Sequence, residues 1–261
     1  MKKWIFALNE RLLDYYGIIA FFLLWEMAPR LGLADPQFIP PFSKVIQAEW
    51  KLLANGELFI HIAVSMQRVL IGMAFAMVIA VPLGFILGGW FPRVAKFFDP
   101  LFSILGQINA FSLFPIFILF FGIGESAKIV IIFWSSIWAI LFATIAGVQH
   151  VEPMYIKSAR SMGANGATIF FKVILPGAAP SIFTGIRMGS TIAFLMLIAA
   201  EMIGASKGLG WLIHNSTINY QMARLFAATI TIALLGAGMN FFIHWIEGNV
   251  VDWKDEADLN P

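Results

Sequence analysis

Cysteine is absent from this 261-residue sequence. A chain without cysteine forms no disulfide, offers no thiol nucleophile and holds no metal through thiolates. The four histidines are scattered, so they predict no metal site either. No acid–base pair or nucleophile–base pair can be assembled from the remaining residues. We therefore expect no catalytic residue, no bound metal and no enzyme activity in this chain.

Charge is also scarce. Only 12% of the residues are charged, whereas 60% are hydrophobic and the mean hydropathy is +0.83. Soluble domains carry about twice that share of charge, so the composition predicts an integral, multi-pass protein of the cell (inner or plasma) membrane. The net charge is only +2 and no run of Lys or Arg occurs, so we expect the lipid bilayer and no nucleic acid as a partner.

A phosphate-binding loop is missing too. The pattern G-x-x-x-x-G-K-[ST] occurs nowhere in the sequence. The apolar runs predict about six membrane spans, which with their loops use nearly the whole chain and leave no room for an ATPase domain. Any ATP that drives this protein must therefore be bound by another polypeptide, and we expect no cofactor on this chain.

The predicted fold class is an all-α membrane protein with both termini in the cytoplasm. Residues 1–14 form the cytoplasmic N-terminus, 15–248 a single transmembrane domain and 249–261 a cytoplasmic tail. A weak excess of Lys and Arg on the inner side agrees with this orientation. The predicted spans are residues 15–33, 65–89, 100–122, 128–148, 181–203 and 225–246.

The third predicted span carries polar side chains at helical spacing. Ser103, Gln107, Asn109 and Ser112 recur every two to four residues, so one continuous helix would place them on one face. A polar stripe in a membrane helix faces protein or a water-filled path rather than lipid. This pattern makes Asn109 and Ser112 candidates for a translocation path. Alternatively, Asn109 forms a hydrogen bond with a neighbouring helix.

Two charged residues lie near the predicted outer boundary. Glu201 is a third candidate for the path, because carboxylates at such positions are often functional. The alternative is a structural partner for a donor such as Lys207. Arg68 anchors the outer end of the second span in one interpretation and attracts anions in the other.

On the same side, Ser43 is expected to cap a helix that ends at Asn55-Gly56.

The longest polar interruption is the loop 151–178. Pro153 suits the first position of a helix, and Gly163 can end that helix in the left-handed conformation. Asn165 can then cap a second helix, which Pro176 is expected to end. A helix–stop–helix between two spans is typical of a segment that an external partner grips, although an ordinary amphipathic loop is the alternative.

This loop resembles the EAA loop of ABC-importer permeases. The family pattern is E-A-A, three residues, G, nine residues and I-x-L-P, and the spacing from Lys157 to Pro176 matches it, with Lys157 in the glutamate position. In that family the loop is the coupling helix that docks on a separate ATPase subunit. The resemblance implies ATPase-coupling roles for Lys157, Ser158, Ala159, Arg160, Gly163, Leu175 and Pro176.

Segments between Ser65 and Trp211 also look like the nitrate/sulfonate/taurine branch of these permeases. They include Ser65-Met-Gln-Arg68 and Ala200-Glu-Met202 followed by Gly208-Leu-Gly210. The resemblance implies a type I importer permease fold, a second copy of the permease, two ABC ATPase subunits that use ATP and Mg, and an extracytoplasmic solute-binding protein. It favours sulfonate-, nitrate- or taurine-like solutes. At 106–112 relatives are proline-rich and this chain reads GQINAFS, so the solute is the weakest inference.

Two other functions compete with the importer. A secondary transporter or channel would work without an ATPase, and ion-coupled carriers usually keep titratable groups at mid-membrane. The second, third, fourth and sixth predicted spans have none in their cores, which disfavours that class. A membrane scaffold would leave the spacing of the loop unexplained.

Overall fold

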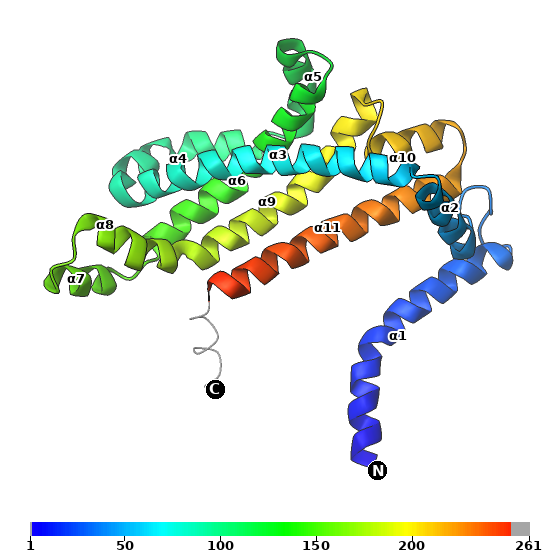
Figure 1. Cartoon of the computed structure of the whole chain (residues 1–261), viewed down its shortest axis with the longest axis horizontal. Helices are drawn as coiled ribbons and strands as arrows, with labels where there is room; N and C mark the ends of the chain where they lie inside the picture. The colour runs from blue at the N-terminus through cyan, green and yellow to red at the C-terminus, as the bar shows by residue number, and fades with distance from the viewer. Residues whose placement is uncertain (1, 252–261) are drawn as a thin grey trace.

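The computed structural model describes the backbone of residues 2–251 and the side chains of residues 16–251 (Figure 1). Within that part the chain is helical throughout its regular elements, and no strand occurs. The predicted tail beyond residue 251, and the side chains of the predicted N-terminal segment 1–14, lie outside the described residues. The elements are α1 (Lys2–Arg30), α2 (Phe42–Ala54), α3 (Glu57–Phe85), the π-helical turn η1 (Ile86–Trp90), α4 (Pro92–Gln107), α5 (Ala110–Phe121), α6 (Glu125–Gln149), α7 (Pro153–Ser161), α8 (Gly166–Ile169), the π-helical turn η2 (Phe170–Ile174), α9 (Leu175–Gly204), α10 (Leu209–Ile218) and α11 (Met222–Val250).

Long helices α3, α6, α9 and α11 run along the long axis of the molecule (Figure 1). Helix α6 packs between α3 and α9. Glycine makes both contacts close: a Cβ added to Gly72 would lie 2.6 Å from the Ile132 side chain, and one added to Gly185 would lie 2.5 Å from Ala143. Small residues at such crossings let helix backbones approach within a membrane.

Four helical segments of the described chain are long and apolar enough to cross a membrane, and the count becomes five if the bent pair α4–α5 is one span. The four are Glu57–Trp90, Glu125–Gln149, Gly166–Gly204 and Met222–Val250. They overlap the second, fourth, fifth and sixth predicted spans. The first predicted span, 15–33, falls mainly on α1. The prediction of an all-α membrane protein is confirmed, with four or five candidate spans among the described residues where about six were predicted.

The prediction of one continuous helix over 100–122 is wrong. Helices α4 and α5 meet at a break where the chain bends by 88°. Ile108 and Asn109 are extended there, and the Asn109 side chain accepts a hydrogen bond from the Phe111 amide at 3.0 Å. Asparagine is a favourable N-cap, so it starts a new helix instead of continuing the old one. The four polar residues therefore do not form one helical stripe.

The expected end of a helix at Pro176 is also wrong. Asn165 caps α8 as predicted, accepting from the Thr168 amide at 2.8 Å. The helix then continues through η2 into α9, so Gly166–Gly204 is one 39-residue segment. The five residues of η2 widen the helix and end at Ile174, two positions before Pro176, which is the second residue of α9. A π-helical turn shifts the hydrogen-bond register, and it thereby accommodates a proline that has no N–H.

Helix α2 covers the opposite end of the molecule from α7 (Figure 1). Ser43 does not cap it: its hydroxyl and its amide both donate to the Glu26 carboxylate, each at 2.9 Å. The carboxylate of α1 therefore occupies the N-terminal end of α2, where the helix dipole favours negative charge. The Trp25 indole adds a hydrogen bond of 3.1 Å to the Pro40 carbonyl. These contacts attach α1 to the bundle at one end.

Candidate coupling loop and buried charge cluster

Helix α7 begins and ends where the sequence predicts. Pro153 occupies its first turn, and Gly163 follows it with φ of +78° in the left-handed region. The Gly163 amide donates to the Arg160 carbonyl, and the Ala164 amide donates to the Ala159 carbonyl, each at 3.0 Å. Such bonds satisfy the last carbonyls of a helix, and glycine pays no steric penalty in this conformation.

Most of α7 faces outward at one end of the molecule (Figure 1). Among the residues that the family resemblance singles out, Ala159 is buried, whereas Lys157, Ser158, Arg160 and Gly163 are exposed. Large apolar side chains are exposed beside them, with Met154 72% and Met162 80% exposed. A short helix with exposed apolar and basic side chains is typical of a docking surface.

The base of this loop meets the end of α3. Leu175 and Pro176 are half-buried at the start of α9. The Trp90 indole of η1 stacks on the Phe170 ring of η2, with centroids 5.7 Å apart and planes 20° from parallel. A cavity of about 430 Å³ lies behind α7 and is lined by Trp90, Arg160 and Phe170, among others. The two π-helical turns thus join the loop to the bundle.

A buried charge cluster lies toward the other end of the long helices. Glu201, in the last turn of α9, is completely buried. Its carboxylate accepts hydrogen bonds from the Ser65 hydroxyl at 2.8 and 2.9 Å, the Arg68 guanidinium at 2.6 Å and the Gly210 amide at 2.8 Å. A buried carboxylate is stable only when charges and donors surround it in this way.

Arg68 is 3% exposed and binds a second carboxylate. Its Nε and Nη2 donate to the two oxygens of Glu125 at 2.5 and 2.7 Å, which is the bidentate geometry that arginine favours. The Lys128 ammonium lies 3.0 Å from the same carboxylate, and Arg68 Nη1 also donates to the Lys207 carbonyl at 2.8 Å. Arg68 on α3 thereby joins the start of α6 to the end of α9.

The cluster also fixes the start of α10. Gly208 has φ of +127°, and a Cβ there would lie 2.4 Å from the carboxyl carbon of Glu201, so only glycine fits. The Gly208 amide donates to His61 Nδ1 at 3.0 Å, and the Leu209 amide donates to the Ser65 hydroxyl at 2.9 Å. Side chains of α3 and α9 therefore satisfy the first N–H groups of α10, as helix ends require.

The three predicted path residues fall in two places. Asn109 and Ser112 are exposed at the α4–α5 bend. Glu201 exposes no surface, so it can contact a solute only if the charge cluster opens. The sequence singled out Arg68 and Glu201 separately, but it predicted neither the contact between them nor the role of Glu125. The signal was faint, since Arg68 lies 133 positions from Glu201 and 57 from Glu125.

Comparison with known proteins identifies the family of this chain. A family model described as "Binding-protein-dependent transport system inner membrane component" matches residues 80–252, more than half of the chain. The chain belongs to this family. It is a permease component of an ABC importer and a multi-pass protein of the inner membrane. The members of this family are not the catalytic subunits of their transporters.

Three relatives support the assignment. The Escherichia coli K12 taurine transport system permease protein TauC is 28% identical over 98% of this chain and 94% of its own length. The putative aliphatic sulfonates transport permease protein SsuC of the same organism is 34% identical over 90% of this chain and 88% of its own. The nitrate import permease protein NrtB of Leptolyngbya laminosa is 30% identical over 89% of this chain and 86% of its own.

A solved structure shares the fold. A chain of the MetNI methionine ABC transporter in an inward-facing conformation superposes with a TM-score of 0.64. The match covers 74% of this chain and 97% of that chain, at 19% identity. The predicted importer permease fold is therefore confirmed.

Proposed function

We propose that this permease is the membrane subunit of an ATP-driven importer and that its loop 151–178 docks on a separate ABC ATPase, which uses ATP and Mg. One observation carries the proposal: the exposed helix α7 and its left-handed turn lead into a single helical segment, Gly166–Gly204, that enters the bundle. A movement of the loop is therefore transmitted directly to the transmembrane helices.

The charge of α7 suggests the chemistry of its dock. Lys157 and Arg160 are both exposed, and the helix contains no acidic residue. We propose that Lys157 meets a carboxylate of the ATPase. Ser158, Ala159 and Gly163 allow close seating, and Leu175 and Pro176 return the chain to the bundle.

Two ATPases imply two docking loops, and we propose a second copy of this permease as the other half. Helix α1 supports this, because it leaves the bundle beyond its contacts with α2 (Figure 1). Most of its described apolar side chains are exposed, including Phe21 at 58% and Leu24 at 70%. In the proposed orientation both termini are cytoplasmic, and an extracytoplasmic solute-binding protein meets the end that carries α2 and α10.

For the solute we propose a small sulfonate, taurine or nitrate, because the relatives carry those names. Asn109 and Ser112 are the proposed path contacts, since both are exposed at the bend between α4 and α5. Glu201 belongs to the proposed path through the charge cluster, which must rearrange before its carboxylate meets a solute.

The first test is gentle detergent extraction of the tagged permease, followed by mass spectrometry of the proteins that co-purify. We expect a near-stoichiometric ATPase with a phosphate-binding loop. Gly163→Val should abolish solute-stimulated ATP hydrolysis, because a left-handed conformation costs a side-chain-bearing residue about 1–2 kcal/mol and β-branching adds crowding. Gly163→Asn is the matched control, since asparagine tolerates this conformation.

The main alternative is a secondary transporter or channel. Recovery of the chain without an ATPase, together with solute uptake into vesicles that contain no ATP, would establish that class. Retention of full coupling in Gly163→Val would contradict the role assigned to the loop.

A further inference from the structure

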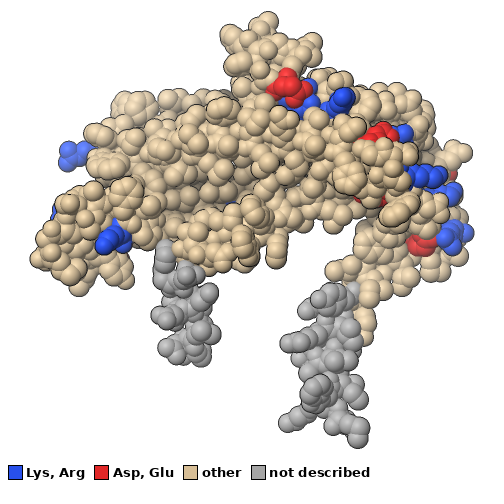
Figure 2. All heavy atoms as spheres, viewed as in Figure 1, with Lys and Arg blue, Asp and Glu red and all other residues tan. Residues whose placement is uncertain are grey.

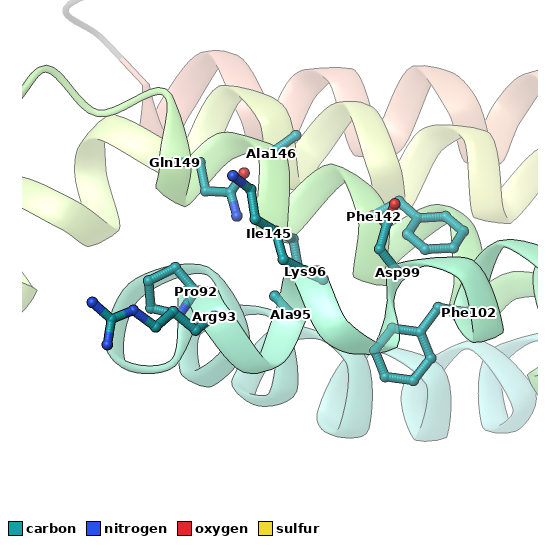
Figure 3. Close-up of a pocket in the computed structure, with 10 residues that line it drawn as sticks. All are labelled: Pro92, Arg93, Ala95, Lys96, Asp99, Phe102, Phe142, Ile145, Ala146 and Gln149. Carbon is teal, nitrogen blue, oxygen red and sulfur yellow. The ribbon is translucent and has the colours of Figure 1, made fainter.

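A second cleft lies between the start of α4 and the end of α6 (Figure 3). It has a volume of about 600 Å³ and is open on one side. Small-molecule sites commonly have volumes of roughly 300–1,000 Å³. None of the residues assigned above to coupling or to the path lines this cleft.

One part of the cleft is cationic. Lys96 reaches from α4 toward Gln149 at the end of α6, whereas the Arg93 guanidinium points away from the cleft centre (Figure 3). Neither cation forms an ion pair with any residue whose side chain the structure describes. An ammonium beside an amide N–H donor is suited to a phosphate or sulfonate group.

The other part is apolar. Phe102, Phe142 and Ile145 line it, so the cleft has an aromatic and aliphatic wall next to its cationic end. A small hydrophilic anion needs no such wall. A ligand with an anionic head and a hydrocarbon body matches both parts.

The neighbouring surface identifies the source of that ligand. Helix α4 exposes Phe97 at 77% and Ile104 at 64%. In a multi-pass membrane protein, an apolar helix face of this kind contacts hydrocarbon. The cleft opens from the bundle at the end that carries the coupling loop. Its assignment to the cytoplasmic leaflet therefore rests on the proposed function.

We propose that this cleft binds one anionic phospholipid of the cytoplasmic leaflet, with its phosphate at Lys96 and Gln149 and its acyl chain against Phe102. Basic pockets between membrane helices on the cytoplasmic side are known to suit such headgroups. Asp99, which also lines the cleft, repels the phosphate. Removal of the two opposite charges should therefore change lipid binding in opposite directions.

The test is native mass spectrometry of the purified transporter, titrated with phosphatidylglycerol after delipidation. Lys96→Gln should weaken retention of the tightest-bound lipid about fivefold, the loss expected for one lysine near an anionic headgroup. Asp99→Asn should strengthen retention by a similar factor. Lys51→Gln makes the same charge change on α2, away from the cleft, and should leave retention unchanged. Phosphatidylcholine, whose choline cation offsets its phosphate, should be retained more weakly and should depend less on Lys96.

Equal retention in Lys96→Gln and the unmodified permease would overturn the proposal. Displacement of the lipid by millimolar inorganic phosphate would also overturn it, because the site would then take a free anion. Lipid retention is measured on the permease itself and needs no ATPase. The absence of a co-purifying ATPase would therefore contradict the proposed importer function but not the lipid site. An assembled, ATP-hydrolysing complex in which Lys96→Gln changes nothing would contradict the lipid site alone.

Discussion

Arg68 binds two carboxylates whose surroundings differ. Glu201 is completely buried, whereas the Glu125 side chain is 60% exposed. Water can replace the guanidinium at Glu125 but cannot reach Glu201, so the inner pair carries most of the penalty for disruption. At the residue scale, Arg68 therefore holds together the core contact of α3 and α9, and Glu125 completes its coordination at the surface.

We expect Glu201→Ala to destabilise the permease by about 3–5 kcal/mol, because it leaves the Arg68 charge buried with its inner partner missing. Glu125→Ala should cost less, about 1 kcal/mol, because the Glu125 side chain is 60% exposed and water can enter the space that it leaves beside the guanidinium. Thermal unfolding of both variants in one detergent would measure the difference. Equal losses of stability in the two variants would show that the buried ion pair contributes no more to folding than the partly exposed one.

The element scale is governed by local deviations from the α-helix. The break at Asn109 divides α4 from α5, and the π-helical turns η1 and η2 bring Trp90 and Phe170 into contact. Each deviation lies where the chain must change direction or absorb a proline. Deviations of this kind are frequent at functional positions in helices.

We expect Trp90→Leu to reduce solute-stimulated ATP hydrolysis severalfold while leaving assembly with the ATPase intact. The stacked pair contributes about 0.5–1.5 kcal/mol beyond its buried area, and its loss loosens the joint between the loop and α3. Trp50→Leu is the control, because Trp50 is 70% exposed on α2. Unchanged stimulation in Trp90→Leu would assign the stack to packing alone.

Local chemistry explains which elements the sequence predicts. Pro153, Gly163 and Asn165 act on their own neighbours, so α7, its left-handed end and the cap of α8 follow from residue type. The bend at Asn109 does not follow, because the surrounding apolar run also suits one straight helix. The contact between Arg68 and Glu201 depends on the packing of α3 against α9, which no short pattern encodes.

At the scale of the whole molecule, much of the surface is uncharged. On the face shown in Figure 2, charged side chains lie at the end that carries α7, over the end that carries α2 and in a group below α5, and uncharged surface covers much of the length between α7 and that group. That distribution suits a body that crosses a bilayer lengthwise. Helix α1 extends away from this body, and its exposed apolar residues need lipid or protein around them.

Because the sequence has no cysteine, a single introduced cysteine can test whether α1 packs against a second copy of the permease. A single cysteine introduced as Phe21→Cys can carry a photoreactive benzophenone, and in a homodimer we expect it to cross-link to a second permease chain. The same label at Lys51→Cys, on α2, controls for random collisions. A dimer band that is no stronger from Phe21→Cys than from Lys51→Cys would contradict packing of α1 on a partner copy.

The segment Gly166–Gly204 has 39 residues, so at ~1.5 Å per residue it is about 58 Å long. Its first residues adjoin the docking loop, and Glu201 lies in its last turn. If the loop docks on an ATPase as proposed, this segment is a lever arm that links the dock to the charge cluster. A tilt of only a few degrees at one end moves the other by several ångströms, so in the proposed importer the Arg68–Glu201 ion pair opposes rotation of the dock.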